Sequence, residues 1–342
     1  MSYSTASQDP GTVRGRTRLC SLVFLLLLAA TLAEFLTGST KILAILFNPV
    51  GFAILIGLYG GGALLIREAA LRWGKRWGAM LLLGGAYAVG EEGFGAKTMV
   101  DPTGSSFGVQ LFTHWMGINW VPLSLLTLFH SVFSICVPIL LLELLLPETR
   151  GRRLLGNIGL GVNVVVYAVA VSLTSLLDHY VIPLPVDAFL ALYAGAFIAA
   201  AYLVPKSFMQ AEKEQPDRGQ RYFFLLGLGF FGCFFLILYF GPLFLQWPVV
   251  AGLYVPLAVL TGTCLVRHAG RSGNEVVKVD FVLGMMVVFI PMDILLELEG
   301  DAGVLVYTAV IFGLLIFLRR RWKRLHAAGA TLYARVTEDT KK

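Results

Sequence analysis

Charge is scarce in this sequence. Only 14% of the 342 residues are Asp, Glu, Lys or Arg, whereas soluble domains typically carry about 25%. Hydrophobic residues make up 57% of the chain and the mean hydropathy is +0.77, so most of the chain has little surface to present to water. The length alone would allow two soluble domains, but this composition excludes them. It favours helices of about 20 apolar residues, each of which crosses about 30 Å of hydrocarbon.

Cysteine pairs and the common catalytic motifs are also missing. The four cysteines stand singly in or beside apolar segments, as small buried hydrophobic residues do: Cys20, Cys136, Cys233 and Cys264. The sequence contains no HExxH zinc motif, no GxSxG nucleophile elbow, no P-loop and no dinucleotide fingerprint. These absences argue against an ATP-driven pump, and we predict neither a metal nor a cofactor.

The apolar residues form ten segments, and positive charge collects in every second gap between them. Of the 27 Lys and Arg residues, 25 lie in these alternate gaps or in the terminal segments, and only Lys41 and Lys97 lie elsewhere. Basic loops translocate poorly, so the pattern predicts about ten helices with both termini in the cytoplasm. The expected spans are residues 19–37, 42–66, 78–100, 121–146, 155–177, 187–205, 222–246, 248–266, 279–297 and 301–318.

The chain is therefore expected to be an all-α, multi-pass helix bundle of the plasma membrane. We predict a cytoplasmic arm at residues 1–18, a transmembrane bundle at 19–318 and a basic cytoplasmic tail at 319–342. The first segment also resembles a signal peptide, because three arginines precede a leucine-rich run that ends near Ala30 and Ala33. Since nine more spans follow, we expect an uncleaved anchor instead. The net charge of +6 does not indicate nucleic acid binding, because the short loops already account for it.

Ionisable residues inside the predicted spans mark the candidate functional site, since each costs about 2.5–3.5 kcal/mol to insert into a membrane. Glu91 and Glu92 stand side by side in a glycine-rich stretch of the third span. At about 1.5 Å of rise per residue, three acids from different spans lie about 20–22 Å above the cytoplasmic edge, and a histidine lies close to that layer. The residues of this predicted polar layer are Glu34, Glu91, Glu92, His130 and Asp293.

A structural role competes with a functional one at each of these positions. Glu91 and Glu92 could accept protons or bind a cation, or an internal partner could neutralise them. Burial favours the protonated form of a carboxyl group, which suits proton coupling. His130 could relay protons or bind a metal, or could be a hydrogen-bonded core histidine. The acids Glu34 and Asp293 could carry function or simply meet water at the outer rim.

Glycine interrupts the second and third spans. Three consecutive glycines occupy residues 60–62, and five more lie between residues 84 and 95. Small residues allow membrane helices to pack closely. A locally broken helix would instead expose backbone groups to a cavity. The sequence leaves both interpretations open.

The glutamate pair resembles the first motif of the CAAX-protease and bacteriocin-processing membrane proteins. That family follows a glutamate dyad with an arginine and adds histidines on later helices. In this sequence the arginine position holds Ala96, with Lys97 one place later. No FxxxH motif surrounds His130, and Ser134 stands one turn later where that family often has Asn. Two of the three motifs are absent, so the resemblance transfers no activity.

The buried acids beside glycine-rich helices favour transport over catalysis. We predict a permease-like protein that moves a small solute or ion through the bilayer, coupled to protonation of Glu91 or Glu92 with help from His130. One alternative is an intramembrane hydrolase that uses the same carboxylates and His130 as general base and acid, which requires them to lie within hydrogen-bond reach. A second alternative is a non-catalytic assembly factor whose acids are already paired. The substrate and the oligomeric state are not encoded in any recognisable motif.

Overall fold

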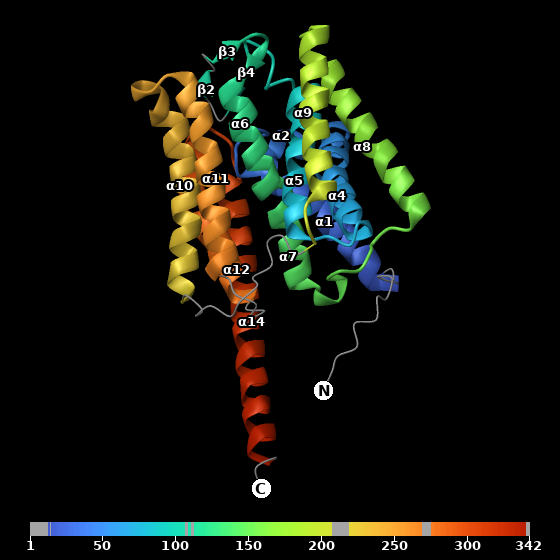
Figure 1. Cartoon of the computed structure of the whole chain (residues 1–342), viewed down its shortest axis with the longest axis vertical. Coiled ribbons are helices and arrows are strands. Elements are labelled where there is room, and N and C mark those ends of the chain that lie inside the picture. Colours follow the sequence, from blue (N-terminus) through green and yellow to red (C-terminus); the bar gives the residue numbers. More distant parts are fainter. Residues whose placement is uncertain are drawn as a thin grey trace. The chain divides into compact units, whose positions relative to one another are not determined.

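The computed structural model shows a helical chain with two short β-hairpins (Figure 1). It describes residues 13, 15–106, 109–110, 113–206, 219–268 and 275–339. Most of the predicted N-terminal arm and the last residues of the tail therefore lie outside the described residues, as do several residues of the charge pattern: Arg14, Lys213, Arg218, Arg271, Lys341 and Lys342. The chain divides into two compact units. Residues 1–34 and 44–208 form the first, and residues 35–43 and 209–342 form the second.

The first unit contains most of the elements between α1 and α9. Three of its helical stretches, η1 to η3, are π-helical, and η4 is a 3-10 turn. The elements are α1 (Gly15–Phe35), α2 (Ile42–Leu46), α3 (Pro49–Leu55), η1 (Ile56–Gly60), α4 (Gly61–Arg72), α5 (Trp77–Ala88), η2 (Val89–Gly95), β1 (Ser105–Ser106), β2 (Val109–Gln110), β3 (His114–Trp115), β4 (Ile118–Asn119), α6 (Trp120–Phe129), η3 (His130–Cys136), α7 (Val137–Leu145), η4 (Pro147–Thr149), α8 (Asn157–Leu177) and α9 (Leu184–Leu203). The strands pair antiparallel as β1–β2 and β3–β4.

The continuous helix Trp120–Leu145, made of α6, η3 and α7, lies at the centre of the first unit. Protein buries 78% of its most apolar stretch, compared with 11% for α8 and 17% for α9. Because α8 and α9 are also strongly apolar but little buried, their side chains are suited to contact lipid. The central helix instead meets protein on most sides, and His130 begins its π-helical part.

Glycines bring helices of the first unit into close contact. A Cβ atom added at Gly60 would lie 2.6 Å from the backbone of Leu26, and one added at Gly84 would lie 2.6 Å from the Cα atom of Ser131. The structure thus supports close packing at these positions. The helical hydrogen bonding also changes nearby, because η1 ends at Gly60 and η2 follows α5 directly. Both spans stay helical there, but with π-helical hydrogen bonds in place of α-helical ones.

A buried ion-pair network joins α4 to the end of the central helix. Arg67 is fully buried, and its guanidinium lies 3.6 Å from carboxylate oxygens of both Glu68 and Glu143. It also donates hydrogen bonds to the carbonyl oxygens of Thr149 and Arg152. Buried charges persist where each has several partners, as here. The network fixes the chain after η4 against α4.

Lys97 has a structural partner that the sequence did not reveal. Its ammonium group donates hydrogen bonds of 2.8–3.0 Å to the carbonyl oxygens of Ser175, Asp178 and Tyr180. Because the last carbonyls of a helix lack partners within the helix, Lys97 caps the C-terminal end of α8. It is 6% exposed, so the ammonium group lies inside the protein at this helix end.

The second unit is a bundle of α10 (Gln220–Phe244), α11 (Trp247–His268), α12 (Glu275–Val287), α13 (Phe289–Leu298) and α14 (Val304–Asp339). Two glycines place α10 and α12 backbone against backbone. A Cβ atom added at Gly227 or at Gly284 would lie 2.0 Å from a carbonyl oxygen of the opposite helix. The helix α14 continues well past the ends of α10 and α12 (Figure 1).

The expected all-α membrane bundle is confirmed, but the count of ten spans is not. Within the described residues, seven helices are long and apolar enough to cross a membrane, or eight if the bent pair α12–α13 is one span. The other two predicted segments are helical without meeting that test. The third corresponds to α5 followed by η2, and the tenth to the start of α14, where consecutive arginines raise the charge.

Candidate functional site

Two π-helical segments of the first unit carry the candidate site. Glu91 and Glu92 lie in η2 at the end of α5, and His130 opens η3 in the central helix. Glu91 and His130 are both 2% exposed, whereas 13% of the Glu92 side chain is exposed. Single π-helical turns inserted in longer helices are frequent at functional sites, because the extra residue redirects neighbouring side chains.

The imidazole of His130 lies between the two carboxylates. Its Nδ1 atom is 3.0 Å from Oε2 of Glu91, and its Nε2 atom is 3.0 Å from Oε1 of Glu92. Ser134, one turn along η3, places its hydroxyl 2.9 Å from Nδ1. Thirty-eight residues separate Glu92 from His130 in the chain, so helix packing alone brings them together.

This arrangement is satisfied either by a neutral histidine, which donates from Nε2 to Glu92 and accepts at Nδ1 from the Ser134 hydroxyl, or by one additional proton shared with Glu91. A neutral imidazole has one donor nitrogen and one acceptor nitrogen, but both nitrogens of His130 face a carboxylate oxygen. An imidazolium would donate to both carboxylates. A neutral imidazole that donates from Nε2 to Glu92 would instead accept at Nδ1 from a protonated Glu91. Oε2 of Glu91 is buried and makes no hydrogen bond of normal geometry with the described residues. The cluster can therefore hold and exchange a proton at Glu91.

Aromatic rings enclose the cluster. The rings of Tyr59, Tyr87 and Phe129 lie 6.2, 5.9 and 5.3 Å from the His130 ring. Tyr59 and Tyr87 are 5% and 4% exposed, so the wall is mostly apolar but carries two phenol groups. The hydroxyl of Tyr87 is buried beside Glu91.

Within the first unit, the structure brings three residues of the predicted polar layer together. Glu91, Glu92 and His130 are in contact, and Glu34 is buried near the end of α1. Asp293 belongs to the second unit, where it is fully buried on α13 and accepts a 2.6 Å hydrogen bond from Thr308 on α14. The phenol groups around His130 were not anticipated, because tyrosines in apolar segments carry no distinguishing sequence signal.

The three contacting residues also form a set of metal-ligand types. One ligand atom from each of Glu91, Glu92 and His130 can be chosen so that all three lie within 4.8 Å of one another. Carboxylate and imidazole groups together suit zinc, manganese or iron, and three ligands would leave a position for water. No sequence motif identifies these three residues as metal ligands. The absence of a metal stays a prediction.

Comparison with known proteins identifies a family for the chain but no activity. The model of an uncharacterized membrane protein family matches residues 23–337, which covers both units. No curated protein and no solved structure matches the chain.

Proposed function

The chain belongs to this uncharacterized membrane protein family, and we propose that it is an intramembrane hydrolase that cleaves an amide or ester bond of a membrane-embedded substrate. The observation that carries the proposal is the contact of one buried imidazole with two carboxylates, at 3.0 Å on each nitrogen. General acid–base catalysis needs groups within about 2.6–3.2 Å of the proton they exchange. The contacts within the cluster already have this length, so its members can pass a proton to one another.

Glu92 is the general base in this proposal. It has the more accessible carboxylate of the pair, with 13% of its side chain exposed compared with 3% for Glu91. Glu92 takes a proton from water while the water oxygen attacks the carbonyl carbon. The bond to the leaving group then breaks, and the leaving nitrogen or oxygen takes a proton from His130. Glu92 returns its proton to His130 across the 3.0 Å contact, which restores the starting state.

The remaining groups have supporting roles. Glu91 stabilises the imidazolium form of His130 from the Nδ1 side, because a second negative charge beside the ring favours protonation. Tyr87 places its phenol beside the imidazole, with ring centroids 5.9 Å apart, and in this proposal it donates to the oxyanion that forms during attack. The aromatic wall excludes bulk water and accepts an apolar substrate.

Heavy-oxygen labelling tests the proposal without knowledge of the natural substrate. The full chain is reconstituted in liposomes of a natural phospholipid extract that also contains single-span peptides, in water labelled with heavy oxygen. We expect mass spectrometry to find the label in a free fatty acid or in a new peptide carboxyl group. Glu92→Gln should lower this product by about 10²–10⁴-fold, the usual contribution of a general base.

Glu148→Gln is the matched control. Glu148 is an exposed acid of η4 in the same unit, so its loss removes one carboxylate without touching the cluster. The proposal fails if the wild-type chain releases no labelled product from either class of substrate. It also fails if Glu92→Gln and Glu148→Gln release equal amounts.

Proton-coupled transport is the second candidate function. The observation that favours it is the burial of Glu91, which is 2% exposed and lies 3.0 Å from the buried ring of His130. Such a group can hold a proton and release it when a solute or cation enters. Liposomes loaded with a pH-sensitive dye separate the two candidates. A permease acidifies or alkalises the interior when a solute gradient is applied, and a hydrolase releases labelled product without a gradient.

A further inference from the structure

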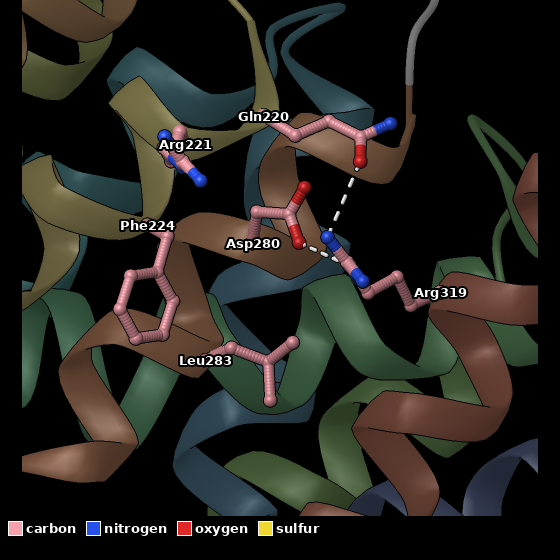
Figure 2. Close-up of a pocket in the computed structure, with 6 residues that line it drawn as sticks. All are labelled: Gln220, Arg221, Phe224, Asp280, Leu283 and Arg319. Atoms are coloured by element: carbon pink, nitrogen blue, oxygen red, sulfur yellow. Dashed lines mark hydrogen bonds and ion pairs between the residues drawn. The ribbon is translucent and has the colours of Figure 1, made fainter.

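A pocket of about 410 Å³ opens among α10, α12 and α14 of the second unit (Figure 2). This volume falls within the range of about 300–1,000 Å³ typical of small-molecule sites. The pocket is independent of the glutamate–histidine cluster, because every lining residue belongs to the second unit. These residues are Gln220, Arg221, Phe224, Asp280, Leu283 and Arg319.

The pocket contains a buried acceptor without a partner. Asp280 is 1% exposed, and its Oδ1 atom accepts a hydrogen bond from Nε of Arg319. Its Oδ2 atom is buried and has no hydrogen bond among the described residues. Figure 2 shows this oxygen turned away from the Arg319 guanidinium, toward the side where Gln220 and Arg221 lie. A buried carboxylate oxygen in this state favours a ligand that donates hydrogen bonds.

The lining also attracts an anion. Arg221 is exposed at the mouth, and the Arg319 side chain is 36% exposed while it also donates to Oε1 of Gln220. Two guanidinium groups against one carboxylate leave a net positive charge. Guanidinium groups bind phosphate oxygens in a planar, two-pronged geometry. The site therefore suits a ligand that carries both a phosphate and a separate hydrogen-bond donor.

The position of the pocket indicates where such a ligand comes from. It lies beside the consecutive arginines of α14, which the charge pattern places at the cytoplasmic membrane surface. Phe224 and Leu283 supply the apolar part of the lining. A molecule with a polar head and hydrocarbon chains at the same depth matches both parts of the lining.

We propose that this pocket binds the headgroup of phosphatidylethanolamine, a phosphate diester that carries a primary ammonium group. The phosphate binds Arg221 and Arg319, the ammonium donates to Oδ2 of Asp280, and the glycerol backbone lies against Phe224. The ammonium is the distinguishing feature. A choline headgroup has no N–H to donate, and a glycerol headgroup offers neutral hydroxyls in place of a cation.

Native mass spectrometry of the purified full-length chain measures this preference. Phosphatidylethanolamine, phosphatidylglycerol and phosphatidylcholine with identical acyl chains are titrated separately in detergent. Soluble glycerophosphoethanolamine is added in a fourth titration, and inorganic phosphate in a fifth. We expect phosphatidylethanolamine to bind about tenfold more tightly than phosphatidylcholine, the value of one charge-assisted hydrogen bond.

Three variants locate the binding. Arg221→Ala and the isosteric Asp280→Asn should each weaken phosphatidylethanolamine binding by about tenfold. Arg320→Ala is the matched control, because Arg320 is exposed on the same turn of α14 and does not line the pocket. Thermal unfolding in the same detergent shows which variants stay folded. If Asp280→Asn unfolds, Arg221→Ala alone decides the outcome.

Each outcome supports or overturns the proposal. The proposal is supported if the chain prefers phosphatidylethanolamine and if Arg221→Ala and Asp280→Asn, but not Arg320→Ala, remove that preference. Equal binding of the three lipids overturns it, and so does a stronger affinity for phosphatidylglycerol, because neither needs the ammonium contact with Asp280. Competition by inorganic phosphate or glycerophosphoethanolamine at equal concentration assigns the site to a soluble phosphate compound and overturns the lipid as ligand. Equal loss in Arg221→Ala and Arg320→Ala places binding outside the pocket.

Discussion

The contact between α10 and α12 makes a quantitative prediction for Gly284→Ala. The added methyl carbon would lie 2.0 Å from the carbonyl oxygen of Phe224 and 2.7 Å from the backbone nitrogen of Leu228. Ordinary contacts of a Cβ atom begin at about 3.4 Å, so the two backbones would have to separate by about 1.4 Å. Neither obstructing atom is a flexible side chain, so the strain cannot be relieved locally.

The expected cost is about 3 kcal/mol, the upper part of the range for overpacked cores, because the whole helix pair must shift. Gly229→Ala is the control on the opposite side of α10, where no described heavy atom lies within 4 Å of the added carbon. This change should be neutral or slightly stabilising, since alanine favours helix by about 1 kcal/mol over glycine.

Reversible unfolding of the purified chain in detergent and denaturant measures both changes. We expect Gly284→Ala to lower the free energy of unfolding, and Gly227→Ala to behave alike because it meets the carbonyl oxygen of Phe281 at 2.0 Å. The reasoning about backbone contact would be refuted if Gly284→Ala and Gly229→Ala unfolded at the same denaturant concentration. The phosphatidylethanolamine titration should also weaken in Gly284→Ala, since the pocket lies between the same helices.

Three further outcomes test other parts of the structure. Lys97→Met leaves three carbonyl oxygens at the end of α8 without a donor and should cost about 3 kcal/mol of unfolding free energy; Lys41→Met, at an exposed lysine, should cost nearly nothing. Arg67→Met leaves two buried carboxylates without their central cation and should cost about 3–5 kcal/mol, with Arg320→Met as the exposed control. A metal chelator such as EDTA should leave the hydrolysis of the substrate unchanged. In the proposed mechanism His130 is an imidazolium, which has no lone pair for a metal. Activity that is lost with EDTA and restored by zinc would contradict this.

The sequence predicted which kinds of residue form the candidate site better than it predicted which of them are in contact. Buried acids and a histidine at a common depth pointed to residues that do meet, since Glu91, Glu92 and His130 are in contact. However, the depth of a residue in the membrane does not show which other helices lie next to it. Asp293 shares the predicted depth but belongs to the second unit and bonds to Thr308.

Composition and charge order alone determined that this chain is a multi-pass helical membrane protein. Hydrophobic length and the side of a loop are local properties, and each can be read from some 20 consecutive residues. The contacts of His130, the capping of α8 by Lys97 and the unpartnered oxygen of Asp280 were decided only by the tertiary structure. Each depends on which helix faces which, and that choice is made by the fit of side chains and glycines between residues far apart in the chain.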